Sequence, residues 1–178
     1  MNLVETGNLL RVEAYKDSIM KRYELAQAMP GGANCHDATY YLLGVKPKEY
    51  GLDGVCRVYL DISIPVDNIN NALFVAFGAR QQSREYDNIL GGVHIATIHP
   101  YDKTKVIHRD IDGYYETRRS HHNFLTGVVD TWDMFTKGLN PMRIESLKAT
   151  QERWKSFSMQ LYTFKPEYFE KLLSSLGL

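Results

Sequence analysis

Apolar and polar side chains alternate between Cys56 and Ile64, which is the clearest period-two pattern in the chain. Such alternation predicts a β-strand that buries one face and exposes the other. Pro65 follows directly and is expected to end this strand.

A helical spacing comes earlier in the chain. From about Leu9 to Met29, apolar side chains recur at gaps of three and four residues, which predicts one face of a helix. Pro30-Gly31-Gly32 is expected to end that helix. The next segment predicts a short helix, with Asn34 near its N-cap and Gly44 just past its end.

The rest of the chain predicts strands mixed with helices. Strands are expected at 93–98 and 105–111, joined as an antiparallel hairpin by the turn residues 100–104, and again at 157–161. Helices are expected at 68–80, where a strand is the alternative, and at 124–137, 143–153 and 166–176. This order predicts an α+β fold in which N-terminal helices pack on a small antiparallel sheet.

Length, charge and hydropathy narrow the function classes. The chain has 178 residues, the size of one domain, and 21 basic residues balance 21 acidic ones, so no net charge draws it onto nucleic acid. The longest apolar run is far shorter than the roughly 20 residues of a membrane span. The first residues do not resemble a signal peptide. We therefore expect a protein that is cytoplasmic as synthesised, and export would need a route independent of a signal peptide.

The two cysteines differ in their surroundings. They are too few for a disulfide framework, although the sequence leaves one bridge between them open. Cys56 falls on the apolar phase of the alternation and is expected in the core. Cys35 opens a predicted helix, where the helix dipole and free N–H groups stabilise a thiolate and can bind an oxyanion. Cys35 is therefore the candidate nucleophile.

A nucleophilic cysteine needs a base, and the predicted hairpin offers one. If its turn centres near Asp102, residues whose numbers sum to about 202–204 face each other, so that His94 lies opposite His108. One imidazole can then take the thiol proton while the other holds its tautomer. Asp110, on the same strand face as His108, is the alternative orienting group.

Three segments carry a family resemblance. A small-residue loop leads into Cys35, Gly91 to Ile98 reads Gly-Gly-Val-His-Ile-Ala-Thr-Ile, and Lys105 to His108 reads Lys-Val-Ile-His. This combination resembles the NlpC-type branch of the papain-like cysteine peptidases. The resemblance implies Cys35 as nucleophile, His94 as base and His108 as orienting residue, with no metal or cofactor. It covers a papain-like core at about 31–112 and leaves 113–178 as a C-terminal helical and strand extension of the single domain.

Four further residues are expected to bind the substrate. Asn34 and His36 flank the cysteine where the family usually has Asp and Ser, and His36 is also a rival base. Tyr23 is the nearest equivalent of the family's upstream aromatic donor to the oxyanion. Asp110 completes the set from the hairpin side.

The resemblance implies a hydrolase that cleaves an amide bond in a peptide or protein substrate through a thioester. Related branches are deamidases, thioesterases or acyltransferases, and these stay as alternatives. Because most members cleave cell-wall peptides, which lie outside the cytoplasm, a secreted effector or toxin with a host or immunity protein as partner also fits this chain.

Two alternatives do without this catalytic pair. A zinc site could draw on Cys35, His94, His99 and His108, although no CxxC or HExxH spacing supports it, and His99 is expected at the surface. A papain-like fold could also serve as a non-catalytic binding module, which would leave the pKa of Cys35 at its ordinary value. For the segment 113–155, the sequence leaves three roles as alternatives: a lid, a specificity cap or a partner surface.

Overall fold

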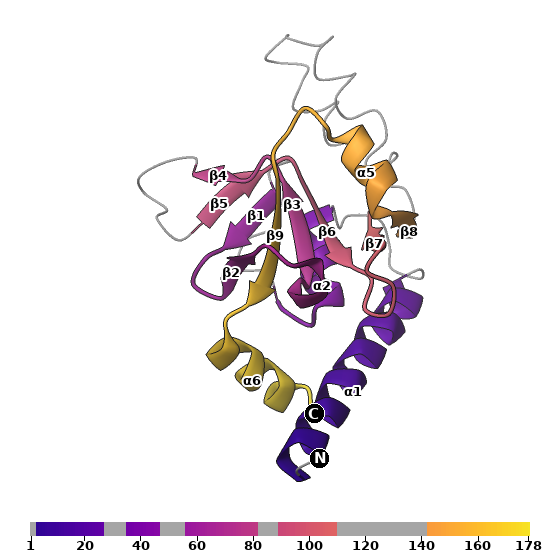
Figure 1. Ribbon diagram of the computed structural model, residues 1–178, viewed down its shortest axis with the longest axis vertical. Coiled ribbons are helices and arrows are strands. Elements are labelled where there is room, and N and C mark those ends of the chain that lie inside the picture. Colours follow the sequence, from indigo (N-terminus) through magenta and orange to yellow (C-terminus); the bar gives the residue numbers. More distant parts are fainter. Residues whose placement is uncertain (1–2, 27–34, 47–55, 82–88, 110–141) are drawn as a thin grey trace, which may run out of the picture.

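The computed structural model describes residues 3–26, 35–46, 56–81, 89–109 and 142–178. In these ranges the chain forms a mixed α+β fold with two antiparallel sheets, which confirms the predicted fold class at that level (Figure 1). No helix in the described ranges combines the length and the apolar character that a bilayer crossing requires.

The helices and strands have the following bounds. The helices are α1 (Leu3–Ala26), α2 (Cys35–Leu42), the 3₁₀ turn η1 (Ile69–Asn71), α5 (Leu147–Arg153) and α6 (Pro166–Ser175). The strands are β1 (Cys56–Tyr59), β2 (Ser63–Val66), β3 (Phe74–Phe77), β4 (Arg80–Gln81), β5 (Ile89–Gly92), β6 (His94–Ile98), β7 (Lys105–His108), β8 (Arg143–Ser146) and β9 (Met159–Phe164).

The larger sheet has six strands in the order β2-β9-β3-β6-β7-β8, and every neighbouring pair is antiparallel. The smaller sheet has the order β1-β5-β4. Two strands of the larger sheet, β8 and β9, come from the part of the chain beyond residue 112 that the resemblance sets apart as an extension. β9 lies between β2 and β3, so this C-terminal segment is an interior strand of the sheet.

The alternating segment at 56–64 forms two strands, which corrects the prediction of one. The chain turns after Tyr59, where the N–H of Ile62 donates to the Tyr59 carbonyl, and β1 and β2 then join different sheets. Pro65 does not end the strand, because it lies inside β2 opposite Tyr162. β2 is at the edge of its sheet, where the missing N–H of a proline leaves no strand unpaired.

The helix predicted at 68–80 is wrong and the strand alternative is confirmed. Only η1 is helical there, capped by the side chain of Asn68, which accepts a hydrogen bond from the Asn70 N–H. The following Phe-Val-Ala-Phe segment is β3, buried along its whole length between β9 and β6. A strand with two covered faces has no period-two pattern, so sequence periodicity does not distinguish it from a buried helix.

The helix predicted at 143–153 is wrong in its first four residues, which form a strand, and right from residue 147 on. Residues 143–146 form β8, and Ser146 then caps α5 by accepting a hydrogen bond from the Ala149 N–H at 3.1 Å. The predictions of the first helix, the hairpin and the last helix are confirmed, although α1 begins earlier, at Leu3. Gly44 follows α2 with a positive φ of 77°, as a helix-ending glycine does. The helix predicted at 124–137 lies outside the described residues.

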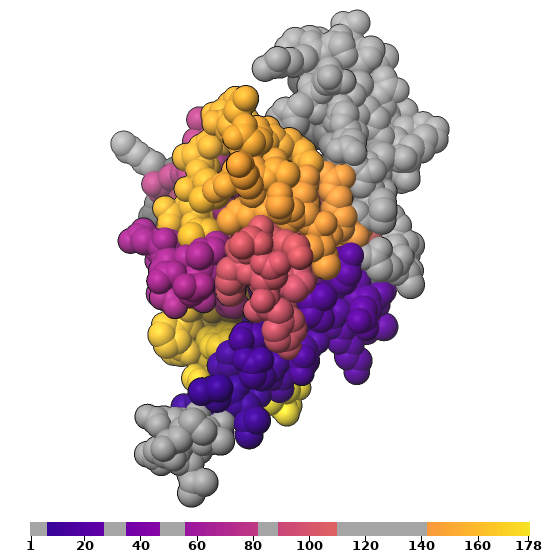
Figure 2. Space-filling view, turned by 45° about the vertical axis from the view of Figure 1, so that its right-hand side comes forward, coloured from indigo at the N-terminus to yellow at the C-terminus, as the bar shows by residue number. Residues whose placement is uncertain are grey.

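α1 and α6 pack together at one end of the molecule, where the start of α1 and the end of the chain approach each other (Figure 1). The Tyr15 ring meets Phe169 edge-on at 5.0 Å, and its hydroxyl donates to the Leu43 carbonyl just after α2. On the face shown in Figure 2, the turn between β6 and β7 lies between α1 and α5. Tyr101 of that turn donates to Asp17 of α1.

Phe74 of β3 lies at the centre of the core, stacked on Tyr162 with ring centroids 5.4 Å apart. We expect Phe74→Ala to lower the free energy of unfolding by about 3–5 kcal/mol, because the neighbouring rings and strands cannot close the cavity. Urea denaturation followed by tryptophan fluorescence measures this loss. Phe157→Ala, at a side chain that is 39% exposed, is the control and should cost less than half as much. Equal losses in the two variants would contradict the assignment of the core.

Candidate active site

Cys35 is the first residue of α2, which packs against β6 and also contacts β7 and β1. Its side chain is only 9% exposed, so the sulfur faces the protein. A sulfur in the first turn of a helix lies beside the N–H groups that the helix leaves unpaired. The packing of α2 on β6 therefore sets where the thiol meets the strands.

The surroundings of Cys35 favour its thiolate. The Cys56 sulfur lies 3.0 Å from the Cys35 sulfur, and the His94 imidazole and the Ile95 N–H also act on the pKa of the Cys35 thiol. The pKa of the Cys35 thiol lies well below its ordinary value, first because of the hydrogen bond from Cys56 and then because of the charge and hydrogen bond of His94. Burial acts in the opposite direction but is outweighed.

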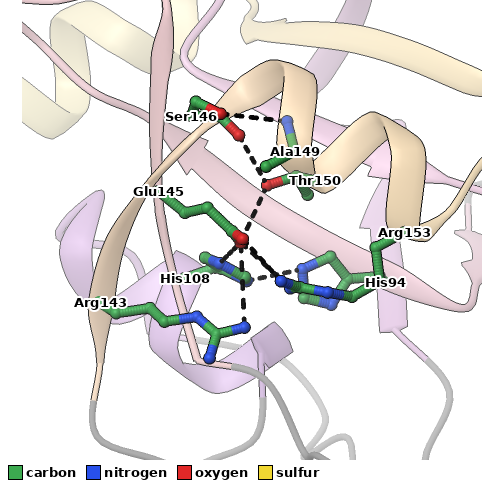
Figure 3. Close-up of polar contacts among 8 residues, drawn as sticks. All are labelled: His94, His108, Arg143, Glu145, Ser146, Ala149, Thr150 and Arg153. Carbon is green, nitrogen blue, oxygen red and sulfur yellow. Dashed lines mark hydrogen bonds and ion pairs between the residues drawn. The ribbon is translucent and has the colours of Figure 1, made fainter.

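Figure 3 shows that His94, His108 and the Glu145 carboxylate form one chain of contacts. The Nε2 atom of His94, the first residue of β6, lies 3.1 Å from Nδ1 of His108, the last residue of β7. The Nε2 atom of His108 lies 2.9 Å from a carboxylate oxygen of Glu145 in β8. Three neighbouring strands thus contribute one side chain each.

The carboxylate sets the direction of these hydrogen bonds. An ionised carboxylate only accepts, so His108 must carry its proton on Nε2 and, when neutral, must accept at Nδ1. His94 then donates from Nε2 to His108, which leaves its Nδ1 unprotonated. That nitrogen is the one available to take the proton of the Cys35 thiol. The chain of contacts therefore holds His94 in the tautomer of a base.

Glu145 is held ionised by cations around it. Arg153 of α5 approaches its two oxygens at 2.6 and 3.1 Å, and Thr150 donates to it at 3.3 Å. Burial alone would raise the pKa of this carboxyl, but the hydrogen bond and charge of Arg153, with the charges of His108 and Arg143, lower it overall. The side chain is 18% exposed, so the carboxylate lies at the rim of the site.

Glu145 was missed as a site residue in the sequence. The sequence pattern predicts a helix from residue 143, whereas residues 143–146 form a strand beside β7, on which Arg143 and Glu145 lie on the same face. The cross-strand pairing places Val106 opposite Glu145 and Arg143 opposite His108. No motif connects Glu145 with the hairpin, because the two segments are 37 residues apart.

The two histidines meet diagonally across the hairpin. The observed partners are Thr97 with Ile107 and Ile98 with Val106. Continuing this register puts Ala96 opposite His108, so the predicted direct pairing of His94 with His108 is wrong by two residues. Residues two apart on a strand share a face, so both imidazoles project from the same side, and diagonal neighbours remain within reach of long side chains.

Trp154, at the end of α5, orients the imidazole of His94. The two rings are stacked, with centroids 5.0 Å apart and an angle of 13° between their planes. Phe77 of β3 lies on the same imidazole at 6.1 Å. These contacts restrict rotation of the ring, so α5 supports the site through Trp154 as well as through Arg153.

Of the remaining predicted site residues, the structure describes His36 and Tyr23, and both contact other parts of the fold. His36 is fully buried, its Nδ1 accepts the Arg57 N–H at 3.1 Å, and its Nε2 faces the Tyr59 hydroxyl at 3.4 Å. Both of its ring nitrogens are thus engaged by β1. Tyr23 is half-buried on α1 at the edge of the core. Asn34 and Asp110 lie outside the described residues.

The zinc alternative finds no support in the described part of the chain. No group of three or more His, Cys, Asp or Glu residues there is arranged to hold a metal ion. His99 lies at the turn between β6 and β7, where its Nδ1 accepts the N–H groups of Tyr101 and Asp102. Its contacts belong to the turn.

Comparison of the chain with protein-family models, curated proteins and solved structures finds no match. A thiolate at the start of a helix, a base held in one tautomer and a second imidazole bonded to a carboxylate are the parts of a cysteine nucleophile with its base and orienting groups.

We expect the alkylation rate of Cys35 by iodoacetamide to reach half its plateau well below pH 8.5, the ordinary thiol pKa being about 8.5. The thiolate is the reactive form, so a lowered pKa moves the whole profile to lower pH. In His94→Ala the profile should move to higher pH. Peptide mass spectrometry assigns the label to Cys35. A midpoint that is ordinary and unaffected by His94→Ala would contradict an activated thiol.

Proposed function

We propose that this protein is a cysteine-dependent acyl-transfer enzyme that hydrolyses an amide bond in a peptide or protein. The proposal rests on one observation, the buried chain of contacts from Cys35 through His94 and His108 to Glu145. It agrees with the resemblance to the NlpC-type branch of papain-like peptidases, and a papain-like arrangement of the core is part of the proposal.

The polar chain favours catalysis over a passive core. Two fully buried imidazoles and a carboxylate cost desolvation free energy that apolar side chains of similar size would not. Their order is also directional, since every donor points from the thiol toward the carboxylate. A binding module needs neither a series of hydrogen bonds that all run in one direction nor a cysteine with a lowered pKa.

The reaction proceeds in two halves. The Cys35 thiolate attacks the substrate carbonyl, and the backbone N–H groups of the first turn of α2 are the candidates to stabilise the oxyanion. Protonated His94 then gives its proton to the leaving amine, and a thioester to Cys35 forms. In the second half, His94 takes a proton from water, which attacks the thioester and releases the acid.

The His108–Glu145 pair matters most when His94 carries a positive charge. In that state His94 has protons on both nitrogens, and the one on Nε2 points at His108. The ionised Glu145 polarises His108 and so stabilises this charge. An amine leaves only when it is protonated, so the arrangement suits an amide better than an ester of an acidic alcohol.

The experiment that tests the proposal is a substrate screen read by mass spectrometry. Muropeptides, proteome-derived peptides, glutamine-containing proteins and acyl thioesters are incubated with the wild-type protein and with Cys35→Ala. New peptide termini indicate amide hydrolysis, whereas deamidated glutamine, loss of thioester or acyl transfer indicate the related reactions. Wild-type turnover that disappears in Cys35→Ala supports the proposal. Turnover that is equal in a folded Cys35→Ala protein would exclude it.

We expect Glu145→Gln to lower kcat/KM by roughly 10- to 100-fold, because a hydrogen bond to a charged group is worth about 1.5–3 kcal/mol and about 1.4 kcal/mol corresponds to a factor of ten. The amide keeps the shape of the side chain but removes its charge. Glu152→Gln is the matched control on the exposed part of α5 and should leave kcat/KM unchanged. A similar loss of kcat/KM in both variants would contradict a positioning role for Glu145.

A further inference from the structure

The two cysteines of the chain meet in the structure, although 21 residues separate them in the sequence. Cys56 is the first residue of β1 and is almost fully buried. It pairs with Gly92 in the smaller sheet, immediately before the strand that carries His94. Its thiol therefore reaches Cys35 from the side of the smaller sheet, while the histidines approach from the larger one.

The backbone around the two thiols is held by contacts between α2 and β1. The Tyr40 hydroxyl donates to the Arg57 carbonyl at 3.1 Å, and His36 accepts the Arg57 N–H. Both sulfurs are thus carried by segments that are already bonded to each other. A disulfide has an S–S length of about 2.05 Å, so the sulfurs, now 3.0 Å apart, need to approach by only about 1 Å.

We propose that Cys35 and Cys56 form a peroxide-reactive pair, in which Cys35 is oxidised and Cys56 resolves it to an intramolecular disulfide. The disulfide itself does not depend on the proposed hydrolase activity. Its consequence does rest on the proposed function, because a nucleophile tied up in a disulfide cannot attack a carbonyl, and a dithiol reductant would restore it.

The chemistry balances with hydrogen peroxide as the oxidant. The Cys35 thiolate attacks one peroxide oxygen, an S–O bond forms as the O–O bond breaks, and the leaving hydroxide takes a proton from His94 and departs as water. The Cys35 sulfenic acid is then attacked by the Cys56 sulfur, whose proton passes to His94. The S–S bond forms as the S–O bond breaks, and the second hydroxide leaves as water with that proton. Two thiols and one peroxide thus give one disulfide and two waters.

The same contact has a second role in the reduced protein. The hydrogen bond between the two sulfurs lowers the pKa of the Cys35 thiol, since a thiolate at Cys35 accepts from the Cys56 thiol. A serine could supply a comparable donor, but it could not resolve a sulfenic acid. Replacing Cys56 by serine therefore keeps a hydrogen-bond donor beside Cys35 and removes only the ability to form a disulfide.

The test treats folded wild-type protein with hydrogen peroxide, removes the peroxide with catalase and blocks remaining thiols with N-ethylmaleimide under denaturing conditions. We expect intact mass to show monomer that has lost both alkylation sites. Peptide mapping should show the peptide of Cys35 linked to that of Cys56, and a dithiol reductant should restore both sites. In Cys56→Ser, Cys35 should instead become a sulfenic acid that dimedone traps, and then a sulfinic acid that the reductant does not reverse.

Wild-type protein alone decides the outcome if Cys56→Ser fails to fold. Two thiols that stay free at every peroxide dose, a sulfinic acid at Cys35 without the linked peptide, or a disulfide only between molecules would each overturn the proposal. The readout is independent of hydrolysis. If the disulfide forms but no substrate is turned over, the redox proposal stands and the proposed hydrolase activity fails. If substrate is turned over but no disulfide forms, the hydrolase proposal stands and the redox proposal fails.

Discussion

The ionised carboxylate of Glu145 sets the direction of the two hydrogen bonds that link it to His108 and His108 to His94. Because Glu145 only accepts, His108 donates to it and His94 donates to His108, which leaves Nδ1 of His94 without a proton. Arg153 keeps that carboxylate charged. The direction of these hydrogen bonds is therefore determined by an ion pair between β8 and α5, at the far end of the chain of contacts from Cys35.

The sequence predicted the residues that local patterns reveal. A cysteine after a glycine-containing loop, and two histidines on a hairpin with a clear turn, could be found because their signals span only a few neighbouring residues. The structure brings Cys35, His94 and His108 together, although the histidines are two residues out of the directly opposite register. Glu145 could not be found in this way, because its partner is distant in sequence and its strand was read as helix.

The errors in the fold have a common physical origin. Periodicity reports which face of an element meets water, so it fails where both faces are covered, as in the Phe-Val-Ala-Phe strand. It also cannot show where a chain passes from one sheet to another, and the alternation from Cys56 to Ile64 continues across such a turn. His36 shows the same limit for single residues. It adjoins the nucleophile in sequence, yet its nitrogens bind β1.

The position of β9 has a consequence for the order in which the molecule is made. This strand lies between β2 and β3, yet it is synthesised after both of them and after the cysteine and the two histidines. A nascent chain that has reached His108 holds Cys35 and both histidines but lacks the strand that joins β2 to β3, and Glu145 has yet to be added. Long-range strand pairing of this kind is slow to form. The larger sheet, which carries both histidines, is therefore complete only after β9 has been added to the chain.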